Sequence, residues 1–213
     1  MFCPEKFETK IGVSNNFAFY KNYPSANYSS YLDSPSNTNG FGLTTKEEYY
    51  FLNYLSLQTG LELIETKIAF NEIYIAPNYG TEMYRHNLDL YELQIPINLK
   101  LTSKNYKNFK AYFYGGIAYR TLPYAIAKIN YPAGGLLNSG QIDAGIYDNK
   151  FSPNVGLGIN YTNKEKKFGF FGEVCYKYLS GEYFYGGQKK HEWINDNLIE
   201  NKQFVSIILG VNF

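Results

Sequence analysis

The stretch ELQIPINLKL, residues 92–101, alternates between two kinds of side chain without a break. Leu93, Ile95, Ile97, Leu99 and Leu101 share one parity, while polar residues and one proline fill the other. Successive side chains of a β-strand point to opposite faces, so this stretch predicts a strand with one aliphatic and one polar face. Its length of about ten residues is typical of a tilted strand that crosses a membrane.

The same alternation recurs along the chain and ends in QFVSIILGVNF, residues 203–213, where Val205, Ile207, Leu209, Val211 and Phe213 are in phase. Alternating segments separated by turn residues predict eight strands. We place them at about 6–19, 49–64, 68–76, 88–101, 109–121, 151–162, 168–180 and 203–213. We expect them to form a single domain over residues 1–213.

The predicted connections alternate in length. They are short after the second, fourth and sixth strands. They are long after the first, third, fifth and seventh, at residues 20–48, 77–87, 122–150 and 181–202. Bacterial outer-membrane barrels have short periplasmic turns and longer extracellular loops. The pattern therefore predicts an all-β fold: a closed, eight-stranded, antiparallel transmembrane barrel with its long loops at one rim and both termini at the other.

Composition supports this fold class. Tyr (23) and Phe (16) bring the aromatic content to 19%, and both residues favour strands and the aromatic girdles of membrane barrels. The sequence contains no run of about 18 apolar residues, so it predicts no helical membrane span. The net charge of +1 argues against nucleic-acid binding. The chain opens MFCPEK without a basic leader or apolar segment, so we expect either a mature form or an engineered version, and whether a signal peptide was removed stays open. Whether Cys3 is a free thiol or a lipidation site stays open.

Residues 91–100, YELQIPINLK, resemble the YLEIPLLLK signature of the PorT-like outer-membrane β-barrel family of Bacteroidota. FYGGIA at 113–118, NVGLGI at 154–159 and ILGVNF at 208–213 add to the resemblance, which covers about residues 50–213. The chain departs from the family pattern in its long first loop and in Gln94. The resemblance implies an eight-stranded, porin-like barrel in the outer membrane of a Gram-negative bacterium, and it implies no particular activity.

The polar parity of the strands should face the lumen, and it carries charges of both signs. Charges removed from water need partners, and the lumen of an eight-stranded barrel is just wide enough for side chains to fill it. We therefore predict a plugged lumen crossed by an ion-pair network, with a proton or ion path as the alternative. The residues of this network are Glu62, Glu92, Lys100, Arg120, Glu173 and Lys177.

The evidence for catalysis is limited to two histidines in predicted loops. His191 precedes Glu192, an arrangement compatible with a general base oriented by a carboxylate, but no serine occupies a matching strand position. His86 lies on a different loop, and no Cys/His spacing indicates a metal site. We expect no catalytic, cofactor-binding or metal-binding residue. A lipid-modifying or proteolytic barrel enzyme remains one alternative, and a soluble lipocalin-like calyx, which would need an apolar lumen, is another.

Clustered aromatic residues mark the predicted outer loops. Three interpretations are open: a membrane girdle with loop self-packing, a surface for a protein partner, or stacking on glycans. The candidates for partner binding are Tyr28, Tyr31, Phe41, Tyr183, Phe184, Tyr185 and Trp193. Our hypothesis is an integral outer-membrane protein with a structural or accessory role, a subunit of a larger secretion, assembly or transport complex. Its partners would be outer-membrane lipid, lipopolysaccharide and other envelope proteins.

Overall fold

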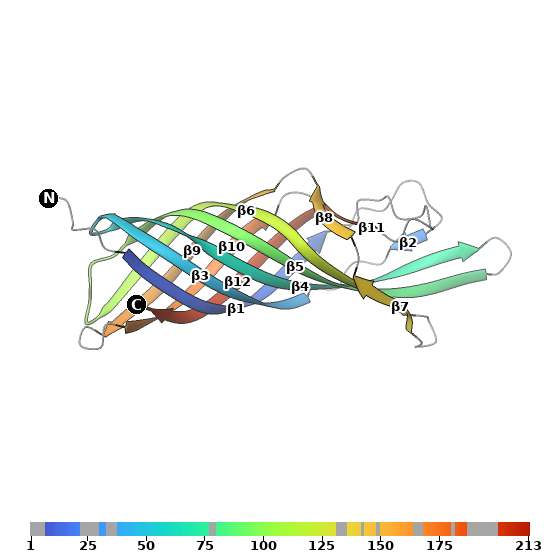
Figure 1. The fold of residues 1–213 in the computed structure, drawn as a ribbon, viewed down its shortest axis with the longest axis horizontal. Helices are drawn as coiled ribbons and strands as arrows, with labels where there is room; N and C mark the ends of the chain where they lie inside the picture. The colour runs from blue at the N-terminus through green and yellow to red at the C-terminus, as the bar shows by residue number, and fades with distance from the viewer. Residues whose placement is uncertain are drawn as a thin grey trace.

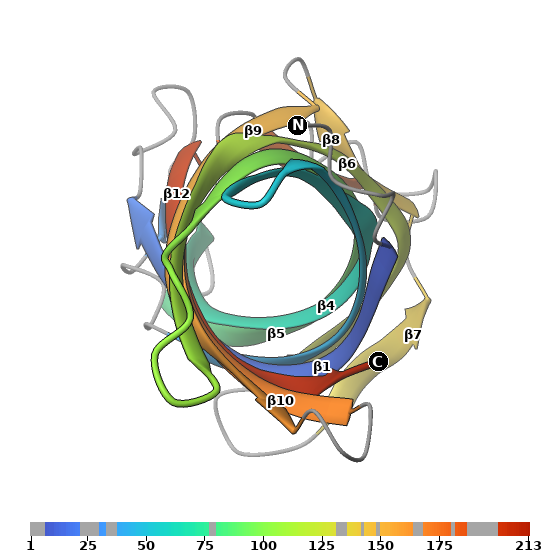
Figure 2. The same ribbon diagram turned by 90° about the vertical axis from the view of Figure 1, so that its left-hand side faces the viewer.

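Eight strands form a closed antiparallel ring in the computed structural model (Figures 1 and 2). The structure describes residues 7–21, 30–32, 38–76, 80–130, 136–141, 143–147, 150–163, 168–179, 182–186 and 200–213. The ring strands are β1 (Phe7–Lys21), β3 (Thr38–Leu52), β4 (Leu55–Ala76), β5 (Gly80–Thr102), β6 (Phe109–Asn130), β9 (Phe151–Asn163), β10 (Phe168–Leu179) and β12 (Glu200–Asn212). Pairing of β1 with β12 closes the barrel. The predicted fold class is confirmed.

Four short strands lie outside the ring. β2 (Ser30–Leu32) pairs with β4, and β7 (Leu136–Gln141) pairs with β6. β8 (Asp143–Tyr147) and β11 (Glu182–Gly186) form a small sheet of their own. All four lie toward the end of the molecule opposite the C-terminus (Figure 1). The described residues contain no helix long and apolar enough to cross a membrane.

Two of the predicted strands are wrong. Residues 49–64 comprise the end of β3, a turn at Asn53 and Tyr54, and the start of β4, while residues 68–76 are the outer half of β4. The predicted loop 20–48 contains most of β3. Thr45 and Glu47 break the apolar alternation of β3 and hide it in the sequence. The missed strand and the divided strand cancel in the count, so the total of eight is correct.

The connections separate by length, with one exception. Asn53–Tyr54, residues 103–108 and residues 164–167 connect strands at one end, which we call the short-turn end. Here Phe213 and Thr9 exchange backbone hydrogen bonds of 2.9 and 3.3 Å. At the opposite end, the segments between β1 and β3, β6 and β9, and β10 and β12 are longer. The predicted long loop 77–87 is wrong, because β4 and β5 continue as paired strands and are joined by residues 77–79 alone.

The outer face of the ring is an apolar belt between two aromatic girdles. Exposed aliphatic side chains on every ring strand form the belt, for example Ile11, Leu43, Leu61, Ile97, Ile117, Leu157, Val174 and Leu209. Contacting rings mark the two edges of the belt. The inner girdle, beside the short turns, contains Phe7–Tyr49, Phe109–Tyr161 and Phe168–Phe170. The outer girdle contains Tyr119–Phe151 and Tyr91–Tyr124 and lies toward the opposite end of the barrel, which we call the outer end. Such a surface is stable only against lipid or another apolar surface.

Glycines on β9 allow tyrosine rings of β6 to lie against the inner wall. Tyr112 pairs with Gly158, and Tyr114 pairs with Gly156. A Cβ at Gly156 would lie 2.3 Å from the Tyr114 ring, and one at Gly158 would lie 2.5 Å from the Tyr112 ring. The GLG sequence of β9 therefore matches the YFY sequence of β6 across the strand pair, and the two rings fill space that side chains on β9 would otherwise occupy.

Pro96 does not introduce the bulge that a mid-strand proline suggests. The β4–β5 pairing continues from Thr59–Ile97 to Glu62–Gln94 without a change of register. The Thr59 hydroxyl donates a hydrogen bond of 2.9 Å to the Pro96 carbonyl and so links the strands where the proline lacks an N–H. The irregularity of β5 lies instead between Tyr91 and Leu93, in its pairing with β6.

Candidate functional site: a lumen filled with ion pairs

The inward parity of the ring strands buries ionisable side chains of both signs. Among the described residues, five basic and four acidic side chains are buried in the lumen. They come from β1, β3, β4, β5, β6 and β10, and are Lys10, Lys46, Glu48, Glu62, Glu92, Lys100, Arg120, Glu173 and Lys177. Their ion pairs and hydrogen bonds divide them into three clusters along the barrel axis.

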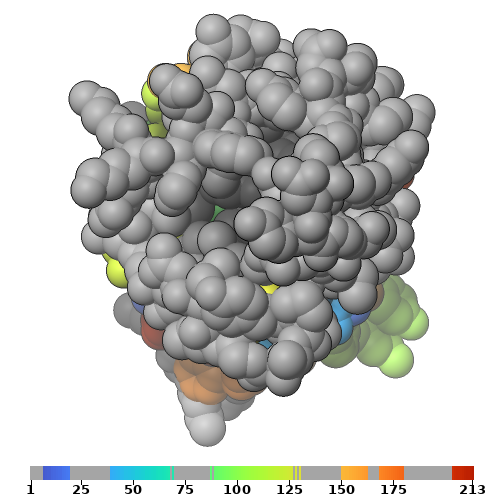
Figure 3. All heavy atoms as spheres, turned by 90° about the vertical axis from the view of Figure 1, so that its right-hand side faces the viewer, coloured from blue at the N-terminus to red at the C-terminus, as the bar shows by residue number. Residues whose placement is uncertain are grey.

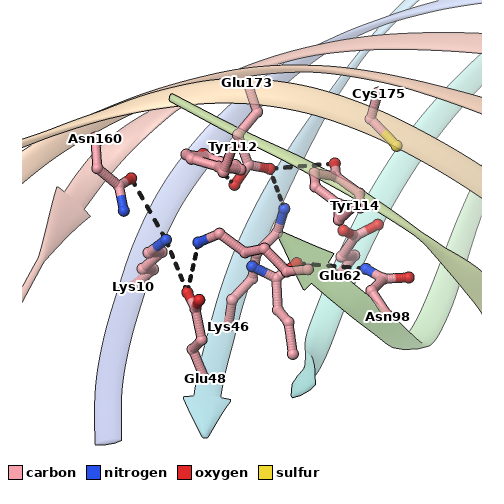
Figure 4. A network of polar contacts seen from close by, with 12 residues as sticks. Lys10, Lys46, Glu48, Glu62, Asn98, Tyr112, Tyr114, Asn160, Glu173 and Cys175 are labelled. Carbon is pink, nitrogen blue, oxygen red and sulfur yellow. Dashed lines mark hydrogen bonds and ion pairs between the residues drawn. The ribbon is translucent and has the colours of Figure 1, made fainter. Parts of the chain in front are cut away.

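The first cluster lies toward the short-turn end and is centred on the Glu48 carboxylate. The Lys10 ammonium lies 3.1 Å from Glu48 Oε2 (Figure 4). The Lys100 ammonium lies 2.6 Å from the same oxygen. The Ser56 hydroxyl donates a 2.6 Å hydrogen bond to Oε1. Two cations and a hydroxyl therefore share one carboxylate that has no contact with solvent.

The second cluster is centred on the Glu173 carboxylate. It forms an ion pair with Lys46, and it accepts hydrogen bonds of 2.7 Å from the Tyr112 hydroxyl and 3.3 Å from the Tyr114 hydroxyl (Figure 4). The Lys100 ammonium of the first cluster lies 3.9 Å from the centre of the Tyr112 ring. Tyr112 thus contacts both clusters, and its cation–π contact favours the lysine charge in this buried position.

The third cluster lies farther toward the opposite end. Arg120 binds Glu92 through two hydrogen bonds, Nε to Oε1 at 2.7 Å and Nη2 to Oε2 at 2.9 Å. Gln94 donates to Glu92 and accepts a 2.8 Å hydrogen bond from Lys177, which also forms an ion pair with Glu62. The planar, bidentate Arg120–Glu92 geometry is the strongest form of such a pair.

An apolar layer follows the third cluster at its outer side. Ala18, Ile64, Leu179 and Phe204 form one buried cluster, each with an exposed fraction of 3% or less. In the sheet, Phe204 is the partner of both Ala18 and Lys177. The lumen is therefore crossed first by ion pairs and then by hydrocarbon side chains.

No family model matches this sequence, and no curated protein matches it. Solved structures do. Neisserial surface protein A aligns with 98% of this chain and 97% of its own, at 12% identity and a TM-score of 0.54. The outer membrane protein AlkL, solved in lipid bilayers, aligns with 97% of this chain and 88% of its own, at 10% identity and a TM-score of 0.51. OprG from Pseudomonas aeruginosa aligns with 97% and 93% at 13% identity and 0.49.

The chain has the fold of an outer-membrane barrel. This fold and the apolar belt together support a location in a bacterial outer membrane, with the short-turn end toward the periplasm. The soluble, lipocalin-like alternative is wrong, because the apolar parity of the strands faces outward and the charged parity faces the lumen. In a soluble calyx this arrangement would be reversed.

All six charges named from the sequence lie in the lumen of this barrel, but in different clusters. Glu62, Glu92, Arg120 and Lys177 belong to the third cluster, whereas Lys100 and Glu173 belong to the first and second. Their partners Lys46 and Glu48 are not among the predicted residues, because most of β3 falls within the predicted loop 20–48. The phase shared by Phe41, Leu43, Tyr49 and Phe51 was the signal for that strand.

The other candidate residues are placed only in part. Tyr28, Trp193, His191 and Cys3 lie outside the described residues. Tyr31 belongs to β2, and Tyr183, Phe184 and Tyr185 belong to β11. Phe41 and His86 do not lie in loops: Phe41 is in β3 with 69% of its surface exposed, and His86 is in β5, paired with Phe70. Across the described part of the chain, no three His, Cys, Asp or Glu side chains form a potential metal site.

Proposed function

We propose that this barrel is a non-enzymatic accessory subunit of a larger outer-membrane assembly and works through its outside surfaces. The observation that carries the proposal is the filled lumen. Three ion-pair clusters and an apolar layer occupy it, and an eight-stranded barrel has no room for a water channel beside them. A lumen built in this way supports the wall, and the surfaces left for function are the lipid-facing belt and the outer end.

The outer end offers more surface than the membrane span requires. Pairing of β4 with β5 continues from Glu65–Tyr91, at the outer girdle, to Ala76–Gly80, and β6 accompanies β5 from Tyr124 to Asn130. At about 3.3 Å per residue, the β4–β5 hairpin extends roughly 35 Å along its strands beyond the girdle. Figures 1 and 3 show this end from the side and along the axis. We propose it as a surface for another envelope protein.

The narrower family assignment is also a proposal. The resemblance of residues 91–100 to the PorT-like signature supports it, and these residues form the inner half of β5 up to Lys100. Membership would favour a Bacteroidota source and a role in secretion, assembly or transport. The aromatic residues of β2 and β11 are proposed to contribute to partner binding at the outer end.

The test is the size of the native particle. Membranes of the source organism would be solubilised in mild detergent, and the barrel detected after native electrophoresis. We expect a species clearly larger than the 24.5 kDa chain with its detergent. A two-residue Asn-Gly turn can join paired strands, so it can replace residues 70–86 at the end of the β4–β5 hairpin. This variant should lose the partner and migrate as the free barrel. A wild-type protein that migrates as the free barrel would refute the proposed function.

Two loop deletions identify the segment that contacts the partner, and each must preserve the ring. A deletion of residues 24–36 leaves β3 intact because β3 begins at Thr38, and a deletion of residues 187–195 leaves β11 intact. Retention of heat-modifiable migration, which reports a folded barrel, provides the control for each variant. A deletion that keeps the barrel folded and the complex intact excludes that segment as the contact.

A further inference from the structure

One sector of the lipid-facing belt is polar. Among the described outward-facing residues between the two girdles, leaving tyrosines aside, the polar side chains are Thr9, Asn15, Thr45, Glu47 and Thr59. All five belong to β1, β3 and β4, which are neighbours in the ring. On the other five ring strands, the described outward-facing polar residues nearest the belt are Thr121, between the girdle residues Tyr119 and Tyr124, and Gln203, paired with Phe19. Both lie at the outer edge, so within the belt the polar residues are concentrated on three adjacent strands.

Glu47 is the only ionisable side chain among these described belt positions. It lies directly between Thr9 and Thr59 in the sheet, and the Thr9 hydroxyl donates a 2.9 Å hydrogen bond to its Oε2. Tyr49 of the inner girdle lies two residues away along β3, so Glu47 is about 7 Å inside the girdle along the strand, and Thr45 about 13 Å. This line of paired residues continues from Thr59 to Ile97 on β5, whose exposed side chain belongs to the apolar belt.

A carboxylate at this position needs a partner that lipid chains do not provide. Ionisable groups on a lipid-facing surface are unfavourable and are rare unless another group binds them. The Thr9 hydrogen bond satisfies only part of the acceptor capacity of a carboxylate. Thr59 already donates to the Pro96 carbonyl. The group that would complete the site is a cation.

We propose that the β1–β3–β4 sector around Glu47 is the docking surface for another membrane-spanning protein that presents a Lys or Arg side chain at this depth. This inference rests on the proposed function and adds a contact within the membrane to the one proposed at the outer end. A second copy of the chain is disfavoured as the partner, because the described belt positions carry no outward-facing Lys or Arg that could pair with Glu47. Thr45 and Asn15 would supply further hydrogen bonds to the partner across the sector.

Photo-crosslinking in native outer membranes tests the proposal. Benzoylphenylalanine would replace Thr45 in the sector and, as a matched control, Leu157 on β9, which is 61% exposed in the apolar belt. We expect a protein adduct from position 45 and none from position 157. Glu47→Gln in the position-45 background should lower the adduct yield at least about tenfold, the effect of losing roughly 1.4 kcal/mol of binding free energy.

The nature of the adduct and the stability of the variant complete the test. Mass spectrometry should place the crosslink in an apolar segment of a different protein that contains Lys or Arg. A crosslink to a second copy of this chain, to lipid alone, or to no molecule would overturn the proposal, as would equal adducts from both positions. Purified Glu47→Gln in lipid vesicles should unfold at the same or a higher urea concentration than wild type; a lower midpoint would assign Glu47 a structural role instead.

These outcomes are separable from the native-size experiment. If the large native particle forms and persists in Glu47→Gln, the docking surface is wrong and the accessory-subunit function stands. If the wild type migrates as a free barrel, both proposals fail.

Discussion

At the scale of single residues, burial decides what a charge contributes. Arg120 is 1% exposed and binds Glu92 through two hydrogen bonds, so Arg120→Ala would leave a carboxylate in the lumen without its main partner. We expect a loss of about 3–5 kcal/mol in the free energy of unfolding. Urea-induced unfolding in lipid vesicles, followed by tryptophan fluorescence or circular dichroism, measures the change.

The matched control is an ion pair that water can reach. Lys128 lies 3.9 Å from Asp89 and keeps 52% of its side-chain surface exposed. Lys128→Ala should therefore change the free energy of unfolding by no more than about 1 kcal/mol. Equal effects from the two substitutions would mean that water enters the lumen and weakens the Arg120 pair.

At the scale of strands, the contact between β6 and β9 depends on the absence of side chains on β9. Gly156→Ala would place a Cβ 2.3 Å from the Tyr114 ring. We expect a loss of about 1–3 kcal/mol in the free energy of unfolding, because the ring must move away from Glu173. Gly172→Ala on β10 is the control: its Cβ would lie 3.4 Å from Leu209, an ordinary contact, and alanine favours the strand by roughly 0.5–1 kcal/mol. The same assay should show opposite signs for the two variants.

At the scale of the whole molecule, the filled lumen predicts a poor conductor. Purified barrel in planar bilayers should give no steady single-channel current comparable with that of a 16-stranded porin, whose lumen holds an aqueous channel. The ion pairs and the layer of Ile64, Leu179 and Phe204 are the physical reason. Large, long-lived currents from the wild type would contradict the closed lumen.

The belt predicts how the molecule responds to charge on its outside. Ile97 is 53% exposed on β5 in the apolar belt, and Ile97→Arg should cost about 2–4 kcal/mol of unfolding free energy in lipid. Leu101→Arg, beside the short turns, should cost no more than about 1 kcal/mol because its guanidinium reaches the interface. A neutral Ile97→Arg would show that this face contacts protein or water.

The sequence predicted the ring well where one parity is uniformly apolar, as in β5, β9 and β12. It failed at β3, where Thr45 and Glu47 occupy lipid-facing positions, so that the alternation that identifies a membrane strand is broken. It also placed a loop at residues 77–87, because a strand that leaves the membrane no longer needs an apolar face. The pairing of charges in the lumen could not be predicted from the sequence either. The alternation predicts which side chains face the lumen, but the shear between strands decides which of them come into contact.

The height of the belt also limits the bilayer that suits this protein. On β1 the outward-facing phenylalanines run from Phe7 to Phe19, and roughly twelve residues at about 3.3 Å each, with a tilt near 40°, span about 30 Å. A typical hydrocarbon core is about 30 Å thick. The barrel should therefore insert most readily into bilayers of about this thickness, and more slowly into lipids with much longer chains. In a membrane of uneven thickness, the molecule would collect where the hydrocarbon core matches its belt.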